Sequence, residues 1–231
     1  MTRAAAVQRR PLASPAEGSA GPLLLRLPII ERMAAVDGWL SEEEADLLIA
    51  GLQRALCETQ EANAVVELGC YRGRGTVVLG SVVQAVRPSA RVYAIDPHDS
   101  LVGALDSHMR RMPPTFPPFE RTIAEAGLGN VVVAVQQHPH EVEWAEPIAF
   151  LLIDGLHDYA SVSGDFFHFE PWLREGACVA FHDYADYFPG VMAFVDELLA
   201  AGRYERVRLA GSLIVARRSA TASPPLPASP S

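Results

Sequence analysis

Val65-Val-Glu-Leu-Gly-Cys-Tyr-Arg-Gly-Arg-Gly75 is an apolar run that ends in Glu67 and then breaks into a turn with glycines at 69, 73 and 75. A buried strand that ends in such a turn lets the backbone approach a ligand where a Cβ would block it. The helix that follows presents free N–H groups at its start. We therefore expect a pocket for a nucleotide-type cofactor at this turn.

The register of the glycines decides between cofactors. A dinucleotide fingerprint, Gly-x-Gly-x-x-Gly, would need a glycine at position 71, where the chain has Tyr71. The pattern is instead Glu-x-Gly-x-x-x-Gly-x-Gly, and the next apolar run, Arg91-Val-Tyr-Ala-Ile-Asp96, again closes on an acid. A nicotinamide-dependent oxidoreductase would use the same kind of sheet with an acid at Asp96, so it remains the alternative enzyme. A non-catalytic cofactor-binding protein is the other alternative.

Short apolar runs alternate with helical patterns through most of the chain. Ser41-Glu-Glu-Glu44 is a capping box, and the apolar spacing after it predicts an amphipathic helix over 42–60. Strands are expected over 64–68, 91–96, 131–136, 148–154 and 177–182, and helices over 74–86, 119–127, 159–173 and 189–201. Two last strand-like runs, 204–209 and 213–217, are too close for a crossover helix and predict a hairpin.

This order of elements predicts an α/β fold, a Rossmann-like, mostly parallel sheet of seven strands with a C-terminal antiparallel hairpin and helices on both faces. We expect one domain over 23–218, with disordered tails over 1–22 and 219–231, which are rich in Ala, Pro and Ser. The segment 97–118 interrupts the alternation. It is expected to be irregular, as a lid over the substrate or as a mobile insertion.

Composition narrows the function. The formal net charge of −9 argues against nucleic acid as a partner. All 19 basic residues are arginine, and the absence of lysine excludes a Schiff-base enzyme and the usual phosphate-loop ATPase. The chain has no apolar run of about 18 residues and no signal-type block, so we expect no membrane partner and a cytoplasmic protein. A small-molecule acceptor is the expected partner, and a homo-oligomer is an open option.

Polar clusters follow two further strands. Phe150-Leu-Leu-Ile-Asp154 continues into Gly-Leu-His157, and Cys178-Val-Ala-Phe ends in His182-Asp183. In open α/β sheets ligands bind beyond the carboxyl ends of the strands. Asp154, His182 and Asp183 could thus surround a divalent ion, although Asp154 could instead cap the helix that begins near Asp158, and each histidine could be structural. The other histidines, which show no ligand spacing and are expected on the surface or in loops, are residues 98, 108, 138, 140 and 168.

With Glu-Leu-Gly-x-Tyr-x-Gly and Asp96, the chain resembles the class I S-adenosylmethionine-dependent methyltransferases of the catechol and caffeoyl type. Asp-Gly-Leu-His-Asp-Tyr, followed by Phe-His-Asp, looks still more like the bacterial macrocin-type branch, which methylates hydroxyls of sugars and secondary metabolites. The resemblance implies cofactor binding by Glu67, Gly69, Tyr71, Gly73, Gly75, Asp96, Gln137 and His138.

In the catechol-type family the positions of Asp154, His182 and Asp183 carry Asp, Asp and Asn as metal ligands. The resemblance therefore implies a divalent metal ion here, and His182 in place of an acid favours a softer ion than Mg²⁺. His157, with Asp154 beside it, is the candidate catalytic residue, and we expect His157 to act as the base. The expected reaction is S-adenosylmethionine-dependent O-methylation.

Overall fold

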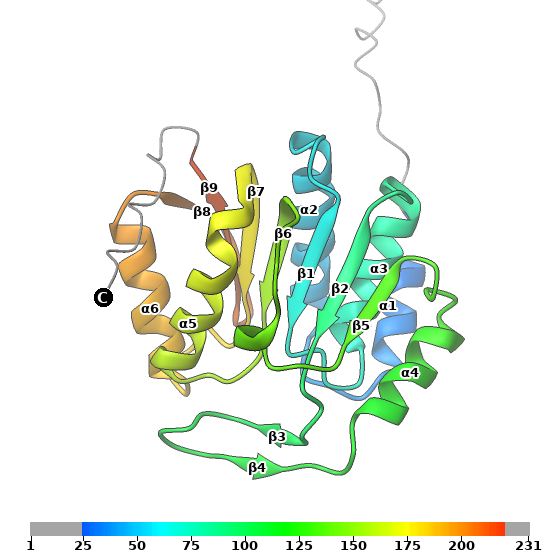
Figure 1. Ribbon diagram of the computed structural model, residues 1–231, viewed down its shortest axis with the longest axis horizontal. Coiled ribbons are helices and arrows are strands. Elements are labelled where there is room, and N and C mark those ends of the chain that lie inside the picture. The colour runs from blue at the N-terminus through cyan, green and yellow to red at the C-terminus, as the bar shows by residue number, and fades with distance from the viewer. Residues whose placement is uncertain (1–24, 220–231) are drawn as a thin grey trace, which may run out of the picture.

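The structure, a computed structural model, describes residues 25–219 (Figure 1). The expected tails over 1–22 and 219–231 lie outside the described residues, except for Ser219, whose N–H donates to the Arg203 carbonyl at 3.0 Å. Within 25–219, no helix combines the length and the apolar character that crossing a bilayer would need.

A seven-stranded sheet forms the centre of the molecule, in the order β5-β2-β1-β6-β7-β9-β8. The strands are β1 (Ala64–Leu68), β2 (Arg91–Ile95), β5 (Val132–Val135), β6 (Ile148–Ile153), β7 (Leu173–Phe181), β8 (Tyr204–Ala210) and β9 (Leu213–Arg218). The first five pair in parallel, and β9 runs antiparallel to both β7 and β8. The predicted sheet and its terminal hairpin are confirmed.

Helices cover both faces of this sheet, and each face has its own apolar core. Helices α1 (Leu27–Ala34), α2 (Glu42–Glu58), α3 (Arg74–Val86) and α4 (Phe116–Glu125) contribute to one cluster of buried side chains. Helices α5 (Tyr159–Phe169) and α6 (Pro189–Ala200) contribute to the other. Because both faces are covered, the parallel strands are mostly apolar, and β1 and β6 are buried at every position.

Some boundaries differ from the sequence-based expectation, and the reasons are local. The helix expected over 159–173 ends at Phe169, because Pro171 cannot continue it and a short 3₁₀ turn, η2 (Glu170–Trp172), follows. Strand β7 therefore begins at Leu173 rather than at 177. Helix α1 was not expected at all. It buries only Ile29 and Met33, too few positions for a clear helical period.

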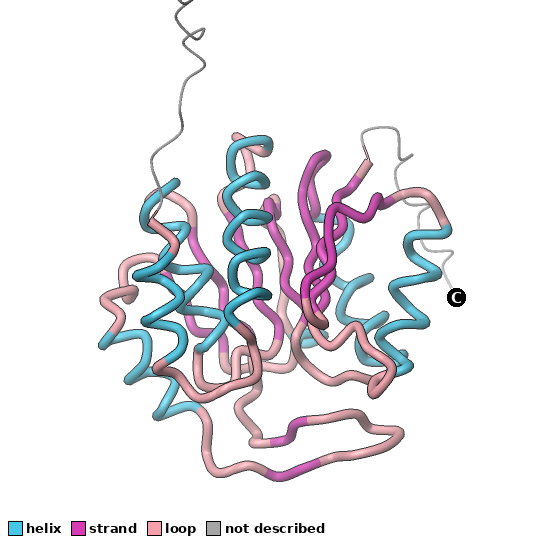
Figure 2. Tube along the Cα trace, turned by 180° about the vertical axis from the view of Figure 1, so that it is seen from behind, coloured by secondary structure: helices cyan, strands magenta, loops and turns pink. Residues whose placement is uncertain are grey.

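Most of the segment 97–118 is irregular, as expected, but it includes the start of α4 and a small two-stranded ribbon of β3 (Leu101–Val102) and β4 (Arg110–Arg111). It lies along the edge where the parallel strands end (Figures 1 and 2). Two hydrogen bonds fix it to the loop after β6: the His157 N–H donates to the Gly103 carbonyl at 3.0 Å, and the Leu105 N–H donates to Asp158 at 3.2 Å. The ribbon thus encloses space at the carboxyl edge of the sheet.

Candidate active site

A cavity of about 1320 Å³ opens at this edge, between the strand ends and the β3–β4 ribbon. Small-molecule sites commonly measure roughly 300–1,000 Å³, so this cavity has room for two ligands side by side. The strand-end residues that line it include Glu67, Gly69, Asp96, Asp154 and His182. The two polar clusters expected from the sequence therefore share one space.

The glycine turn after β1 is shaped by close contacts. Gly69 has φ +83°, and a Cβ there would clash with the backbone carbonyl of Asp154. A Cβ at Gly75 would meet the carboxylate of Glu67. Gly73, with φ +91°, instead faces Phe119 of α4 and does not line the cavity. Gly69 and Gly75 therefore let the turn pack closely against the end of β6 and against Glu67 at the cavity wall, and Gly73 allows close packing of α3 against α4.

Asp96 stands at the end of β2 with both carboxylate oxygens held by backbone groups. The Tyr71 N–H donates to Oδ2 at 2.9 Å, and the His98 N–H donates to Oδ1 at 2.7 Å. These bonds connect the glycine turn to the neighbouring strand end. The carboxylate is held at the cavity wall, where its remaining lone pairs can accept hydrogen bonds from a ligand.

Glu67 is 1% exposed and accepts a hydrogen bond from the Thr76 hydroxyl at 2.5 Å. Burial, together with the charges of Asp154 and Asp96, raises the pKa of Glu67 to about 8, although the Thr76 hydrogen bond lowers it. The side chain is therefore mostly protonated at neutral pH. A ligand cation beside it would favour the carboxylate form.

This raised pKa predicts how stability depends on pH. The folded protein holds the Glu67 proton more tightly than the unfolded chain, so its contribution is complete below about pH 4.5 and is lost as pH rises through about 8. Each unit of pKa difference corresponds to about 1.4 kcal/mol. In urea unfolding, Glu67→Gln should match the wild type near pH 5 and exceed it clearly near pH 9. If Glu67→Gln and the wild type differ in unfolding free energy by the same amount at both pH values, the raised pKa of Glu67 is contradicted. The exposed Glu120→Gln is the control and should show no difference that depends on pH.

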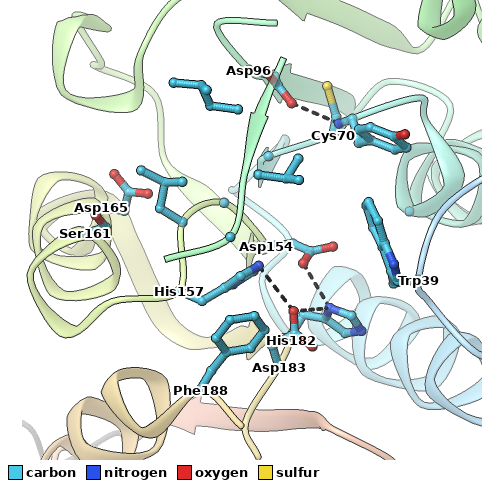
Figure 3. A pocket seen from close by; sticks show the side chains of 18 of the residues that line it. Trp39, Cys70, Asp96, Asp154, His157, Ser161, Asp165, His182, Asp183 and Phe188 are labelled. Carbon is cyan, nitrogen blue, oxygen red and sulfur yellow. Dashed lines mark hydrogen bonds and ion pairs between the residues drawn. The ribbon is translucent and has the colours of Figure 1, made fainter. Parts of the chain in front are cut away.

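His182 lies at the centre of a cluster of acids at the ends of β6 and β7 (Figure 3). Its Nδ1 is 2.9 Å from Asp154 Oδ1 and 3.5 Å from Asp183 Oδ2. On the other side of Asp183, His157 Nε2 lies 3.2 Å from the same Oδ2. The structure therefore brings together all four residues that the sequence singled out at these two strand ends.

Glu44 is a fifth member of this cluster that the sequence did not reveal. Its Oε2 lies 3.5 Å from His182 Nε2, and its Oε1 accepts hydrogen bonds from the Ser212 N–H at 2.7 Å and from the Ser212 hydroxyl at 2.8 Å. The sequence marks Glu44 only as the capping-box acid of α2, a role it also has, since it accepts from the Ser41 N–H at 2.8 Å. One carboxylate thus joins a helix start, a hairpin turn and the site.

The charges in the cluster give His182 and His157 different protonation states. Burial alone would lower the pKa of His182, but Asp154, Asp183 and Glu44 raise it well above its ordinary value. Its Nδ1 therefore requires a positive partner, either a proton or a metal ion. For His157 burial outweighs the neighbouring acids and lowers the pKa, so this imidazole is neutral at neutral pH.

The donor atoms fit a divalent metal ion. Ligand atoms that each bind an ion at about 2.1 Å lie roughly 3.0–3.5 Å apart, close to the separations between His182 Nδ1 and the two aspartates. The three groups lie within 4.8 Å of one another. A ligating histidine usually directs its other ring N–H at a carboxylate, and the Glu44 carboxylate is the one nearest to His182 Nε2, at 3.5 Å, too far for a direct hydrogen bond. One nitrogen and two oxygen donors favour Zn²⁺, Mn²⁺ or Fe²⁺ over Mg²⁺.

The remaining histidines were expected on the surface or in loops, and His108, His138 and His140 are exposed and lie outside the α-helices and strands, whereas His168 is half-buried on α5. All four line the cavity, but Gln137, which was expected with His138 to bind the cofactor, does not. The His98 side chain is only 2% exposed. Its Nε2 lies 3.7 Å from Cys70 Sγ, but burial raises the pKa of the Cys70 thiol, which makes this pair a poor metal site.

A parallel sheet with an antiparallel terminal hairpin, and a cavity where its strands end, defines the class of Rossmann-like methyltransferases. The chain belongs to the methyltransferase domain family, whose model matches residues 66–184. The expected resemblance and the expected fold are thus confirmed.

Solved structures show the same fold at low sequence identity. The O-methyltransferase NovP superimposes with a TM-score of 0.65 at 16% identity, over 79% of this chain and 83% of its own. The calicheamicin methyltransferase CalS11 superimposes with a TM-score of 0.60 at 14% identity, over 83% of this chain and 90% of its own. The O-methyltransferase TomG from Streptomyces achromogenes was solved with S-adenosylmethionine. It superimposes with a TM-score of 0.54 at 17% identity, over 84% of this chain and 87% of its own.

Proposed function

We propose that the protein transfers the methyl group of S-adenosylmethionine to a hydroxyl oxygen of a small molecule, a sugar or a secondary metabolite. One observation carries the proposal: the glycine turn with Asp96 and the cluster around His182 line the same cavity. A methyl donor bound at the first and a hydroxyl bound at the second would therefore meet. The names of NovP, CalS11 and TomG, which are methyltransferases of this fold, support the choice.

The donor would lie along the ends of β1 and β2. Gly69, Tyr71 and Gly75 would surround its methionine part, since all three line the cavity. Glu67 would face the amino end, where a cation suits a buried carboxyl group. Asp96, fixed by two backbone N–H groups, would accept hydrogen bonds from the ribose hydroxyls.

The acceptor would occupy the space between Trp39 and Phe188, which flank the Asp154–His182 cluster from opposite sides (Figure 3). Phe188 packs on His157 with ring centroids 4.3 Å apart, and Trp39 packs on Tyr71 at 5.0 Å. Apolar walls around a few polar groups are typical of small-molecule sites. They would hold the body of the acceptor while its hydroxyl faces His157.

In the reaction the acceptor oxygen forms a bond to the methyl carbon as the S–CH₃ bond breaks, giving a methyl ether and S-adenosylhomocysteine. Holding the two reactants in line can contribute roughly 7–11 kcal/mol to the lowering of the barrier. The neutral His157 would donate its Nε2–H to Asp183 and take the hydroxyl proton at Nδ1. Asp183, 3.2 Å away, would stabilise the imidazolium that results.

A metal ion, if bound, would be held by Asp154, His182 and Asp183. A divalent ion at that place supplies a Lewis acid, which lowers the pKa of a hydroxyl bound to it. Glu44 would then keep the Nε2–H tautomer of His182, so that Nδ1 faces the two aspartates.

The proposal is tested by incubating the protein with methyl-labelled S-adenosylmethionine and a panel of hydroxyl compounds, followed by mass spectrometry. We expect the label in a methyl ether, with one S-adenosylhomocysteine released for each methyl group transferred. Label found on nitrogen or carbon, or no transfer to any hydroxyl in the panel, would count against O-methylation.

Removal of metal ions gives a separate prediction. Treatment with EDTA should lower methyl transfer at least about tenfold, and a divalent ion should restore it, because the acceptor hydroxyl would lose its Lewis acid. Donor affinity should stay unchanged, since Asp96 and the glycine turn need no ion. If turnover is indifferent to EDTA, the cluster around His182 holds a proton instead, and His157 works without a metal ion.

A further inference from the structure

One arm of the cavity lies outside the places proposed above for the ribose, the methionine part and the acceptor. It lies between the segment that follows β5 and helix α5, which contact each other through the 3₁₀ turn η1 (Pro139–Glu141). His138 lines the arm from the β5 side, and Gly164, Asp165 and His168 line it from α5. Because β5 is the sheet neighbour of β2, this arm adjoins the strand end that carries Asp96.

Asp165 is the unusual residue of this arm. Within residues 25–219 its carboxyl group makes no hydrogen bond and no ion pair, although it is partly buried. Burial, with the charge of Asp158, raises its pKa to about 7. Figure 3 shows its side chain beside Ser161 on α5, on the side of the cavity opposite Trp39. A carboxyl group that has lost water without gaining a partner is costly unless a ligand supplies a donor.

The surroundings of Asp165 suit a flat ring. Asp165 Oδ2 lies 3.6 Å from the position that a Cβ would take at Gly155, so the carboxyl group extends over the loop after β6. A Cβ at Gly164 would meet nothing within 4 Å, which leaves open space on the cavity side of the helix. Two glycines and one carboxyl group therefore border an open space at this place, in the arm that His138 and His168 also line.

We propose that Asp165 binds the 6-amino group of the adenine of S-adenosylmethionine and so selects this base; the inference rests on the proposed function. A ribose held by Asp96 places its base next to β5, in the arm that Asp165 lines. Adenine presents an amino donor beside a ring-nitrogen acceptor, and a carboxyl or carboxamide group pairs with such an edge. Asp165 is thus a specificity-determining residue, distinct from the residues that hold the ribose and the methionine.

The test compares S-adenosylhomocysteine with an analogue in which unsubstituted purine replaces adenine, by calorimetry on the full chain. The wild type should bind S-adenosylhomocysteine about tenfold more tightly, the loss expected for one hydrogen bond to a carboxyl group. Asp165→Leu, which keeps the size of the side chain, should bind both ligands equally. Asp165→Asn, which can still accept from the amino group, should keep most of the preference.

Each outcome of this experiment either supports or contradicts the role of Asp165. A wild type that binds both ligands alike, or an Asp165→Leu variant that keeps the wild-type preference, would overturn the role of Asp165 and leave the proposed function intact. A wild type that binds neither ligand would overturn the proposed function and this inference together. If Asp165→Leu does not fold, the wild-type preference and the behaviour of Asp165→Asn still decide, since a preference lost in folded Asp165→Asn also contradicts the proposal.

Discussion

Replacing Asp96 by alanine is expected to weaken the binding of S-adenosylmethionine at least about hundredfold and to leave the fold intact. The carboxylate would accept two hydrogen bonds from the ribose, and a bond to a charged group contributes about 1.5–3 kcal/mol. The side chain is partly exposed to the cavity and fills no core position, so the fold should survive the loss of its bonds to the Tyr71 and His98 N–H groups, and the main effect falls on the cofactor site. Calorimetry with S-adenosylhomocysteine measures the change directly.

Two further variants make this result specific. Asp96→Asn keeps an acceptor for one backbone N–H group and should show a smaller loss of affinity. Asp106→Ala removes an exposed carboxylate from the turn of the β3–β4 ribbon and should change nothing. A folded Asp96→Ala protein with wild-type donor affinity would remove the ribose assignment.

Replacing His157 by glutamine is expected to lower kcat at least about tenfold with little change in donor affinity. Proton removal by a placed base contributes about 10²–10⁴-fold, and it acts in the transition state rather than in donor binding. Glutamine has a similar length and can still donate to Asp183, but it cannot take a proton. Steady-state kinetics with an identified acceptor, beside calorimetry with S-adenosylhomocysteine, separates the two effects.

His168→Gln is the matched control for this experiment. His168 lines the arm proposed for adenine, and its Nε2 lies 2.9 Å from the Val142 carbonyl, so its substitution should affect donor affinity or stability rather than kcat. If His157→Gln keeps its turnover and only unfolds at a lower temperature, His157 is a structural residue. The base must then be sought elsewhere in the cluster, with His182 as the next candidate.

The sequence predicted the sheet well, because its signals are local. Apolar runs such as Ile148–Ile153 are buried at every position and are bounded by turns, so period and length suffice to find them. The ribbon in 97–118 was missed for the opposite reason. Its strands have two residues each and include Arg110–Arg111, so neither length nor hydrophobicity marks them.

The site was predictable only where its residues stand at strand ends. Asp154, His157, His182 and Asp183 follow buried strands, and parallel strands end at one edge, so the sequence was enough to group them. Glu44 meets Ser212 across 168 residues, and Asp165 meets no partner among the described residues. Such features depend on how distant segments pack together, which no local pattern encodes.

The central claim is that the cavity is a binding site for S-adenosylmethionine, and its most direct test is a calorimetric titration of the full chain with S-adenosylhomocysteine and, separately, with NAD⁺. We predict saturable binding of S-adenosylhomocysteine at one site per chain, and this binding should be retained in EDTA and lost in Asp96→Ala. We predict no binding of NAD⁺, because Tyr71 stands where a dinucleotide fingerprint needs glycine. Binding of NAD⁺ at a site that depends on Asp96, with none of S-adenosylhomocysteine, would contradict the account.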